Sequence, residues 1–346
     1  MKKTVLHLLK SDIFSGAERI VCQIISMFQD DEYRMVYCSL DGVVREHVQK
    51  RGIEYYPLKE FSDAEIKKVF SEIHPDIIHA HDFSAGFMAA KHKTAPIVSH
   101  LHNNPPWLSE INKKSLAYAA AIPRIDRIFG VSDAVRSDYI FRGIMRNKFE
   151  VLPNIVHTPY VTEMAGKKDV AEDIDLLFVG RFAPQKNPLR VLKIVNLLKE
   201  MDKKVNVLML GEGRLRTECQ EYITAHGLED QVQLPGFTEN PYPYMKKAKL
   251  MIQPSLYEGF GLMIIEAMSL GTPVICSGAG GMKDIVNEKC GVICSTDQEY
   301  VNAVIKLLED DNLRQTMGKE AEHRAYLYGD VDAYKNKLHT CYTELL

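Results

Sequence analysis

The segment LMIQPSLYEGFGLMIIEAMSLGTPVICSG, residues 250–278, predicts a strand, a helix and a second strand in succession. Its two ends are short apolar runs of the kind that form buried strands. Between them, Gly261 to Leu270 has a helical pattern, with Gly271 just past its end and Pro273 as a stop. This helix is apolar nearly all round, which is typical of a buried helix. It nevertheless carries one carboxylate, Glu266, whose role needs an explanation.

The same alternation of strand and helix runs along the whole chain. The expected strands of the first half are TVLHLL, RMVYCSL, IEYYPL, DIIHAHD, PIVSHLH, RIFGVS and FEVLPN, and those of the second half are DLLFVGR, VNVLMLG, QVQLPGF, LMIQPS, PVICSG and GVICS. Strict alternation predicts βαβ units and parallel sheets, so we expect an α/β protein with two doubly wound domains.

The boundary between the two domains is predicted where the chain turns polar and non-periodic, between residues 154 and 175. We expect domains at 1–160 and 161–321. In open parallel sheets, ligands bind beyond the carboxyl ends of the strands. A ligand is therefore expected in a cleft between the domains.

Composition excludes several classes of protein. A chain of 346 residues is long enough for two cores, and a net charge of -3 gives no basic field for nucleic acid. The seven cysteines are odd in number and scattered, which favours a reduced cytoplasmic setting, with Cys290 and Cys294 as small core residues. No apolar run approaches the ~18 residues of a membrane span, and MKKTVLHLLK is charged too early for a secretory signal. We expect a protein that is cytoplasmic, with peripheral contact to the inner membrane face left open.

Two glutamates frame the start of the helix in the opening segment. Glu258 falls in the loop before it, and Glu266 lies a little over one turn into it. A buried carboxylate needs hydrogen-bond donors, and a ribose diol supplies two; a core Arg or Lys is the alternative partner. The backbone N–H groups of Gly259, Phe260 and Gly261, leading into Leu262, are available to a sugar or a phosphate at the helix start.

Cations follow another strand of the second half. The run DLLFVGR ends in Arg181, and Lys186 comes after the short loop FAPQKNP. A fork-shaped and a compact cation at one strand end suit a diphosphate, although a solvated loop pair is an equal alternative on these residues alone. In the first half, Gly16 opens a helix whose N–H groups could approach the same phosphates.

The remaining motifs are weaker indications of function. The histidine pairs His79/His81 and His100/His102 each lie on one face of a strand end, which allows zinc, but no third motif supplies a carboxylate at a familiar spacing. We therefore expect no metal site. Neither GEGRLR nor GAGGMK has the spacing of a dinucleotide fingerprint, so a nicotinamide enzyme is unsupported. The triplets that begin at Asp173 and Asp330 are not placed to hold a nucleotide diphosphate.

Together these motifs resemble a known family. GAERI, HAHD, VGR with Lys186, GEGRLR, VQLPGF, PSLYEGFGLMIIEAMSLGTPVICS and GGMKDIV are similar to segments of the retaining nucleotide-sugar glycosyltransferases of family 4, which have the GT-B fold. The resemblance runs from about residue 4 to residue 310, and its most specific element is the pair of glutamates, Glu258 and Glu266. Asp284 stands where the family more often has glutamate, and the chain is somewhat short for the family, which leaves the acceptor unspecified.

The resemblance implies a role for each residue of the second half. Glu266 would hold the ribose, and Glu258 would contact a hydroxyl of the donor sugar. Arg181 and Lys186 would stabilise the departing diphosphate in place of a metal. The backbone around Gly236 and Phe237 would read the base.

In the first half, the resemblance implies a histidine near the reacting sugar, and His102 matches that place best, with His81 second. The last segment, 322–346, would cross back as a helix and pack on the N-terminal domain. The donor would be a nucleotide sugar, with UDP-sugars favoured, and no cofactor is implied. A glycan or lipid-linked molecule would be the acceptor.

Two other classes of function stay open at this stage. A catalytically silent glycosyltransferase-like subunit would bind sugar nucleotide without turnover, which a turnover assay decides. A nucleotide-sugar epimerase or a metal hydrolase would be separated by product analysis and metal content.

Overall fold

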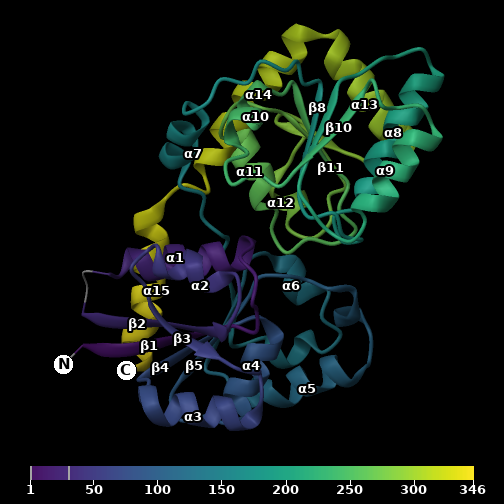
Figure 1. The fold of residues 1–346 in the computed structure, drawn as a ribbon. Coiled ribbons are helices and arrows are strands. Elements are labelled where there is room, and N and C mark those ends of the chain that lie inside the picture. Colours follow the sequence, from purple (N-terminus) through teal and green to yellow (C-terminus); the bar gives the residue numbers. More distant parts are fainter. Residues whose placement is uncertain (1, 30–31) are drawn as a thin grey trace. The chain divides into compact units, whose positions relative to one another are not determined.

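The structure is a computed structural model that describes residues 2–29 and 32–346. The chain forms two compact units, Met1–Ile155 with Val331–Leu346, and Val156–Asp330. Each unit is a parallel sheet with helices packed against it (Figure 1).

The first unit contains a seven-stranded parallel sheet in the order β3-β2-β1-β4-β5-β6-β7. Its strands are β1 (Lys3–Leu8), β2 (Tyr33–Leu40), β3 (Glu54–Leu58), β4 (Ile77–His81), β5 (Ile97–Leu101), β6 (Arg127–Gly130) and β7 (Phe149–Val151). Its helices are α1 (Gly16–Met27), α2 (Val44–Gln49), α3 (Asp63–Ile73), α4 (Asp82–Lys91), α5 (Lys113–Ala121), α6 (Asp133–Ser137) and α15 (Val331–Leu345), with 3-10 turns η1 (Pro106–Ser109), η2 (Ile122–Arg124) and η3 (Arg142–Met145). Strands β1, β4 and β5 are buried along nearly their whole length, as in parallel sheets whose two faces are covered by helices.

The second unit contains a six-stranded parallel sheet in the order β10-β9-β8-β11-β12-β13. Its strands are β8 (Leu176–Val179), β9 (Val207–Leu210), β10 (Val232–Gly236), β11 (Leu250–Gln253), β12 (Val274–Cys276) and β13 (Gly291–Ile293). Its helices are α7 (Thr158–Ala165), α8 (Pro188–Glu200), α9 (Arg216–Ala225), α10 (Tyr242–Lys247), α11 (Leu262–Met268), α12 (Met282–Ile285), α13 (Asp297–Glu309) and α14 (Asp311–Tyr326).

The prediction of two doubly wound α/β domains is confirmed, because every expected strand is present in one of the two parallel sheets. The division points differ in detail from the expected 160 and 321. Helix α14 runs through residue 321 and stays with the second unit, since Arg324 donates hydrogen bonds to the carbonyl oxygens of Ile285 (3.0 Å) and Asp284 (2.5 Å).

The last helix, α15, belongs to the first unit, as expected for a C-terminal helix that crosses back. Tyr342 on this helix is fully buried, and its hydroxyl lies 2.7 Å from Nδ1 of His79 in β4. Its ring also contacts those of Phe28 and Tyr33. The helix therefore completes the core of a unit that begins more than three hundred residues earlier in the chain.

All seven cysteines are buried and free, which confirms Cys290 and Cys294 as small core residues. Asp175 accepts a hydrogen bond from the backbone N–H of Asn206 and pairs with Lys249. The first aspartate triplet is thus part of the structure of the second sheet.

Candidate functional site

The second unit gathers its predicted site residues at one edge of the sheet. Strands β8, β9, β10 and β11 lie in one parallel sheet, so their carboxyl ends meet at the same edge. Arg181 follows β8, Phe237 follows β10, and Glu258 follows β11. The loops after these three strands therefore form the candidate site of this unit.

The loop after β8 is fixed by a residue that the sequence did not single out. Gln185 is buried, accepts a hydrogen bond from Nη2 of Arg181 at 3.2 Å, and donates one to the carbonyl oxygen of Tyr257 at 3.3 Å. The backbone N–H of Leu256 donates to the carbonyl oxygen of Gln185 at 2.8 Å. Gln185 therefore ties the cationic loop after β8 to the glutamate loop after β11 and orients the exposed Arg181.

Lys186 and Glu258 form an ion pair between these two loops, in which Nζ donates to Oε2. Their side chains are only 16% and 13% exposed. Removal of either partner would leave the other charge partly buried and unpaired, which is costly. The resemblance assigned the two residues to different parts of a donor, and the structure places them in direct contact.

Glu266 lies on α11 and is 3% exposed. Its Oε1 accepts a hydrogen bond from the hydroxyl of Tyr242, on α10, at 3.3 Å. The sequence offered a ribose diol or a core Arg or Lys as partners for this carboxylate, and one partner that the structure shows is the neutral hydroxyl of Tyr242. A second donor such as a sugar hydroxyl is chemically compatible with this arrangement.

Helix α11 is shorter than the predicted Gly261 to Leu270. Gly261 is its N-cap with φ 111°, a left-handed conformation that favours glycine, and an added Cβ would lie 3.1 Å from Cγ of Met282. The helix ends at Met268 because the N–H of Thr272 bonds back to the carbonyl oxygen of Ala267. The residues before Leu262 are therefore turn and not helix.

Phe260 is buried and its ring lies 5.5 Å from that of Tyr328. Its side chain is therefore engaged in the core of the second unit, so only the backbone of Gly259, Phe260 and Gly261 could meet a ligand. The sequence analysis likewise gave these residues a role through their backbone N–H groups.

The turn after β10 presents an aromatic ring to solvent. Gly236 has φ 98°, and Phe237, which follows it, is 72% exposed. An exposed ring at the carboxyl end of a strand is a stacking surface for a flat ligand. The predicted base-reading position is thus accessible.

The motif GEGRLR has a structural function that the sequence analysis missed. A Cβ on Gly211 would lie 1.9 Å from the carbonyl oxygen of Gly180, and one on Gly213 would lie 2.5 Å from that of Phe182. The N–H of Phe182 donates to the carbonyl oxygen of Glu212 at 2.8 Å. The two glycines therefore let the loop after β9 support the loop that carries Arg181.

In the first unit, Gly16 is the first residue of α1, as predicted. The buried carboxylate of Glu18 accepts hydrogen bonds from the N–H (2.9 Å) and hydroxyl (2.6 Å) of Ser15 at the same helix end. A negative charge therefore already stands at this N-terminus, which weakens its attraction for phosphate.

His102 lies directly after β5 and is 8% exposed. Its backbone N–H donates to Oδ1 of Asp82 at 2.8 Å, and its Nε2 lies 2.9 Å from Nδ1 of His81. Burial raises the pKa of the Asp82 carboxyl to about 7, although the hydrogen bond from the backbone N–H of His102 lowers it. Asp82 also has φ 66°, an uncommon conformation for a residue other than glycine. Strained residues of this kind cluster at functional sites.

Five buried histidines lie side by side on, or directly after, the three central strands β1, β4 and β5: His7, His79, His81, His100 and His102. Burial lowers the pKa of His7 to about 3 and that of His102 to about 4, the latter opposed by the side chain of Asn154. It lowers the pKa values of the other three well below the ordinary range. The cluster is therefore uncharged near neutral pH.

We expect the histidine cluster to make the protein sensitive to acid. Each pKa is lower in the folded state than its ordinary value near 6.5, so the unfolded chain binds more protons as the pH falls below ~6.5. The free energy of unfolding is therefore unaffected by these histidines above pH ~6.5. It falls between pH ~6.5 and pH 4 to 3, by up to ~1.4 kcal/mol per pH unit for each histidine. Asp82, whose pKa is raised in the folded state, has the opposite effect on stability and offsets the loss from one histidine.

Urea unfolding at pH 7.5, 6 and 5 measures this loss. His7→Leu should reduce the slope of the unfolding free energy against pH. A free energy of unfolding that stays constant from pH 7.5 to 5 would contradict the lowered pKa values.

Two family models match the chain. The model described as "Glycosyltransferase Family 4" matches residues 14–159, and the model described as "Glycosyl transferases group 1" matches residues 162–324. Together they account for both parallel-sheet units.

Curated relatives are similar over most of the chain. A Campylobacter jejuni N-acetylgalactosamine-N,N'-diacetylbacillosaminyl-diphospho-undecaprenol 4-alpha-N-acetylgalactosaminyltransferase is 29% identical over 71% of this chain and 67% of its own length. An Escherichia coli UDP-Gal:alpha-D-GlcNAc-diphosphoundecaprenol alpha-1,3-galactosyltransferase is 23% identical over 93% of this chain and 92% of its own.

Among solved structures, Anabaena Alr3699/HepE in complex with UDP matches with a TM-score of 0.85 and 21% identity, over 100% of both chains. A mutant of TarM from S. aureus, solved in complex with fondaparinux, alpha-GlcNAc-glycerol and UDP, matches with a TM-score of 0.81 and 15% identity, over 98% of this chain and 99% of that one. At these identities the likeness establishes the fold, which is the GT-B fold.

Proposed function

Because the chain belongs to glycosyltransferase family 4 and is therefore a sugar-transferring enzyme, we propose that it uses a nucleotide-sugar donor with retention of configuration and without a metal ion. One observation carries this proposal: after β8, Lys186 pairs with Glu258 of the loop after β11, and Arg181 is linked to the same loop through Gln185, which donates to the carbonyl oxygen of Tyr257. Two cations there can stabilise a departing diphosphate, which is the task a metal ion performs in other transferases. No cofactor is required for this reaction.

A UDP-sugar is the donor that we propose. The Anabaena protein is described in complex with UDP and with UDP-glucose, and the name of the Escherichia coli relative specifies UDP-Gal. The exposed ring of Phe237 and the buried carboxylate of Glu266 suit a base and a ribose.

The test of this proposal is a thermal-shift screen against UDP-, GDP- and ADP-sugars, since a ligand that binds the native state alone raises its stability by an amount that grows with the logarithm of concentration over Kd. We expect the largest shift with a UDP-sugar. If only sugar nucleotides with another base raise the melting temperature, the donor carries that base and not uracil. Binding without turnover on any acceptor would favour a catalytically silent subunit.

For the acceptor, we propose a lipid-linked or glycan molecule. Both bacterial relatives described above act, by their names, on sugars attached to diphospho-undecaprenol. Product analysis by NMR with such acceptors gives the linkage, and the anomeric configuration of the product tests retention.

The two glutamates should have separable effects on binding. We expect Glu266→Gln to weaken free UDP, because its carboxylate faces the ribose in this proposal. Glu258→Gln should weaken mainly the contribution of the sugar, so that UDP binds nearly normally and the UDP-sugar binds less tightly. Calorimetric titration of UDP and UDP-sugar against both variants measures this, and equal losses of UDP affinity in the two would contradict the assignment.

We also propose peripheral contact with the inner face of an anionic membrane. In the part of the chain that the structure describes, no helix is long and apolar enough to cross a bilayer. Two segments of the first unit, 106–116 and 139–146, are tied by hydrogen bonds and expose apolar and basic side chains: Ile111, Lys113, Lys114, Leu116, Ile140, Arg142, Ile144 and Arg146. Mixed surfaces of this kind suit anionic headgroups.

Flotation with vesicles tests this contact. We expect binding to phosphatidylglycerol vesicles but little to phosphatidylcholine vesicles, and loss of binding in Ile111→Asp/Ile144→Asp. Equal binding by the double variant would place the contact elsewhere.

A further inference from the structure

Three of the five buried histidines form a chain of hydrogen bonds across β1, β4 and β5. Nδ1 of His7 lies 3.0 Å from Nε2 of His81, and Nδ1 of His81 lies 2.9 Å from Nε2 of His102. Among the described residues, Nε2 of His7 has no hydrogen-bond partner. Nδ1 of His102 is buried, and the side chain of Asn154 acts on the same ring. The chain thus begins in the core at His7 and ends at Nδ1 of His102.

Histidine nitrogens this close together could instead bind a metal ion. Within the described residues, two sets have ring nitrogens within 4.8 Å of one another: His7, His79 and His81, and His81, His100 and His102. Two nitrogens on a tetrahedral zinc ion with bonds of ~2.0–2.1 Å would be about 3.3 Å apart. The observed 3.0 and 2.9 Å are hydrogen-bond distances.

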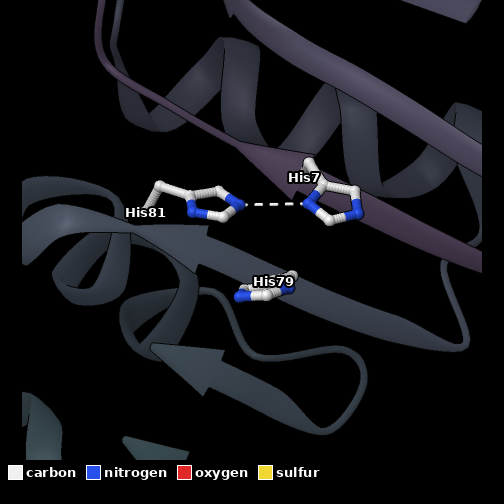
Figure 2. A group of neighbouring side chains, drawn as sticks. All are labelled: His7, His79 and His81. Atoms are coloured by element: carbon white, nitrogen blue, oxygen red, sulfur yellow. Dashed lines mark hydrogen bonds between the residues drawn. The ribbon is translucent and has the colours of Figure 1, made fainter. Parts of the chain in front are cut away.

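The ring planes decide between a metal site and a hydrogen-bonded chain. In Figure 2, His7 and His81 meet edge to edge along the dashed line, whereas His79 lies beside them. The rings of His79 and His81 are stacked, with centroids 4.4 Å apart and planes at 23°, and those of His100 and His102 are stacked at 4.3 Å and 28°. An imidazole nitrogen binds a metal in the plane of its ring, so a stacked third ring does not point at a shared ion. The geometry is that of a hydrogen-bonded chain.

A neutral histidine carries one N–H, which leaves the chain two arrangements. In one, all three histidines carry the proton on Nδ1, and Nδ1 of His102 is a donor. In the other, all three carry it on Nε2, and Nδ1 of His102 is an acceptor. Interconversion would move one proton along each of the two bonds and would also need a proton added at Nε2 of His7 as one leaves Nδ1 of His102, or the reverse. Nε2 of His7 is buried and has no hydrogen-bond partner among the described residues that could supply or take up this proton, so the chain holds one arrangement.

We propose that His7 and His81 are positioning residues that set, through this chain, whether His102 donates or accepts a hydrogen bond at Nδ1. This inference rests on the proposed function and on the role that the resemblance implies for His102, near the reacting sugar. A hydroxyl both donates and accepts, so it can pair with His102 in either arrangement of the chain without the ring becoming charged.

Two further observations support this role. The backbone of His102 is held separately by Asp82, so the histidine chain acts on a side chain whose main chain is already fixed. The lowered pKa values keep the three rings neutral near pH 7, so each ring carries a single N–H.

Four variants separate this role from simple packing. His81→Leu removes both hydrogen bonds of the central ring. His81→Asn places an amide where Nδ1 stood, which keeps a bond to His102 but cuts the link to His7. His7→Leu removes only the far end. His100→Leu is the matched control, because His100 is equally buried and stacks on His102, yet neither of its ring nitrogens has a partner among the described residues.

Steady-state kinetics with a UDP-sugar is the first readout. We expect His81→Leu to lower kcat by roughly ten- to a hundredfold with KM for the donor nearly unchanged, a loss typical of misplaced catalytic groups. His81→Asn should recover most of this loss, and His100→Leu should stay near the wild type. The proposal fails if His100→Leu is as slow as His81→Leu, or if His81→Asn gives no recovery. Circular dichroism melting of each variant separates unfolding from loss of function.

The second readout is independent of turnover. Ring ¹⁵N NMR of the ligand-free protein, labelled on histidine, reports the tautomer of each residue. We expect His7, His81 and His102 to share one tautomer, and His102 to shift in both His81→Leu and His7→Leu but not in His100→Leu. Unchanged His102 signals in His81→Leu would overturn the coupling even in an active enzyme. Coupled signals without turnover would instead refute the proposed function alone. Stoichiometric zinc in the purified wild type, lost in His81→Leu, would replace the hydrogen-bonded chain with a metal site.

Discussion

Arg181→Ala and Lys186→Ala are each expected to lower kcat/KM by roughly two to three orders of magnitude, the usual loss when one charge-stabilising group is removed. Negative charge develops on the diphosphate as its bond to the sugar breaks. The two side chains stand at the carboxyl end of β8, and no other cation is assigned to this charge in the proposed mechanism. The loss should fall mainly on kcat, because the charge is greater in the transition state than in the ground state.

The two substitutions should differ in their effect on stability. Arg181 is exposed, so its removal costs little folding free energy. Lys186 neutralises Glu258, and Lys186→Ala leaves that carboxylate unpaired, so the melting temperature should fall as well. Lys186→Ala/Glu258→Gln should recover stability but not activity. Lys193→Ala, an exposed lysine of α8 away from this loop, is the control that should stay near wild type in both measurements.

A metal-independent enzyme should also retain its activity in EDTA. Full activity of either alanine variant, or strict dependence on Mn²⁺, would falsify the assignment of these cations to the leaving diphosphate.

His102→Ala is expected to lower kcat on the order of a hundredfold and to leave the affinity for free UDP nearly unchanged. In a retaining transfer, positive charge builds on the sugar ring as the diphosphate leaves, and we expect the acceptor to attack from the same face. His102 would hold the donor sugar through a hydrogen bond to a hydroxyl and would not abstract a proton. Its lowered pKa agrees with a neutral ring at working pH.

Separate measurements of kcat and of UDP affinity test this role. If UDP affinity falls together with kcat, His102 supports the structure of the site. His81, the second histidine that the resemblance suggested, does not replace it, because both of its ring nitrogens are hydrogen-bonded to other histidines. The melting temperature of His102→Ala should be measured alongside, because the ring is almost fully buried and stacks on His100.

The fold could be predicted from the sequence because the inner strands of both sheets are buried on both faces and appear as short runs, mostly apolar, between turns. The rule that ligand-binding residues follow such strands also placed Arg181 and Glu258 at one edge of the second sheet. Their side-chain partners could not be predicted in the same way. Lys186 and Glu258 are 72 positions apart, and their contact depends on how two loops fold against each other.

Two features were missed for identifiable reasons. Gln185 looked like an ordinary polar loop residue, and only its burial reveals that it joins two loops. His7 stood alone in TVLHLL, and no spacing connected it to the other histidines. The register of the sheet does so, because His7 lies opposite His79 in β1 and β4. Register between distant parallel strands is not encoded in the local pattern of a single sequence.

The return of α15 to the first unit has a consequence for biogenesis. Tyr342, which closes over His79, is synthesised only after the whole of Val156–Asp330. At ~5–20 residues per second, a ribosome takes roughly 10 to 35 seconds to make that intervening stretch. During this time the nascent first sheet lacks its last helix and exposes apolar surface that Tyr342 and Leu338 later cover. The second unit, whose residues are contiguous in the chain, can therefore finish folding before the first, and the order of synthesis is opposite to the order of completion.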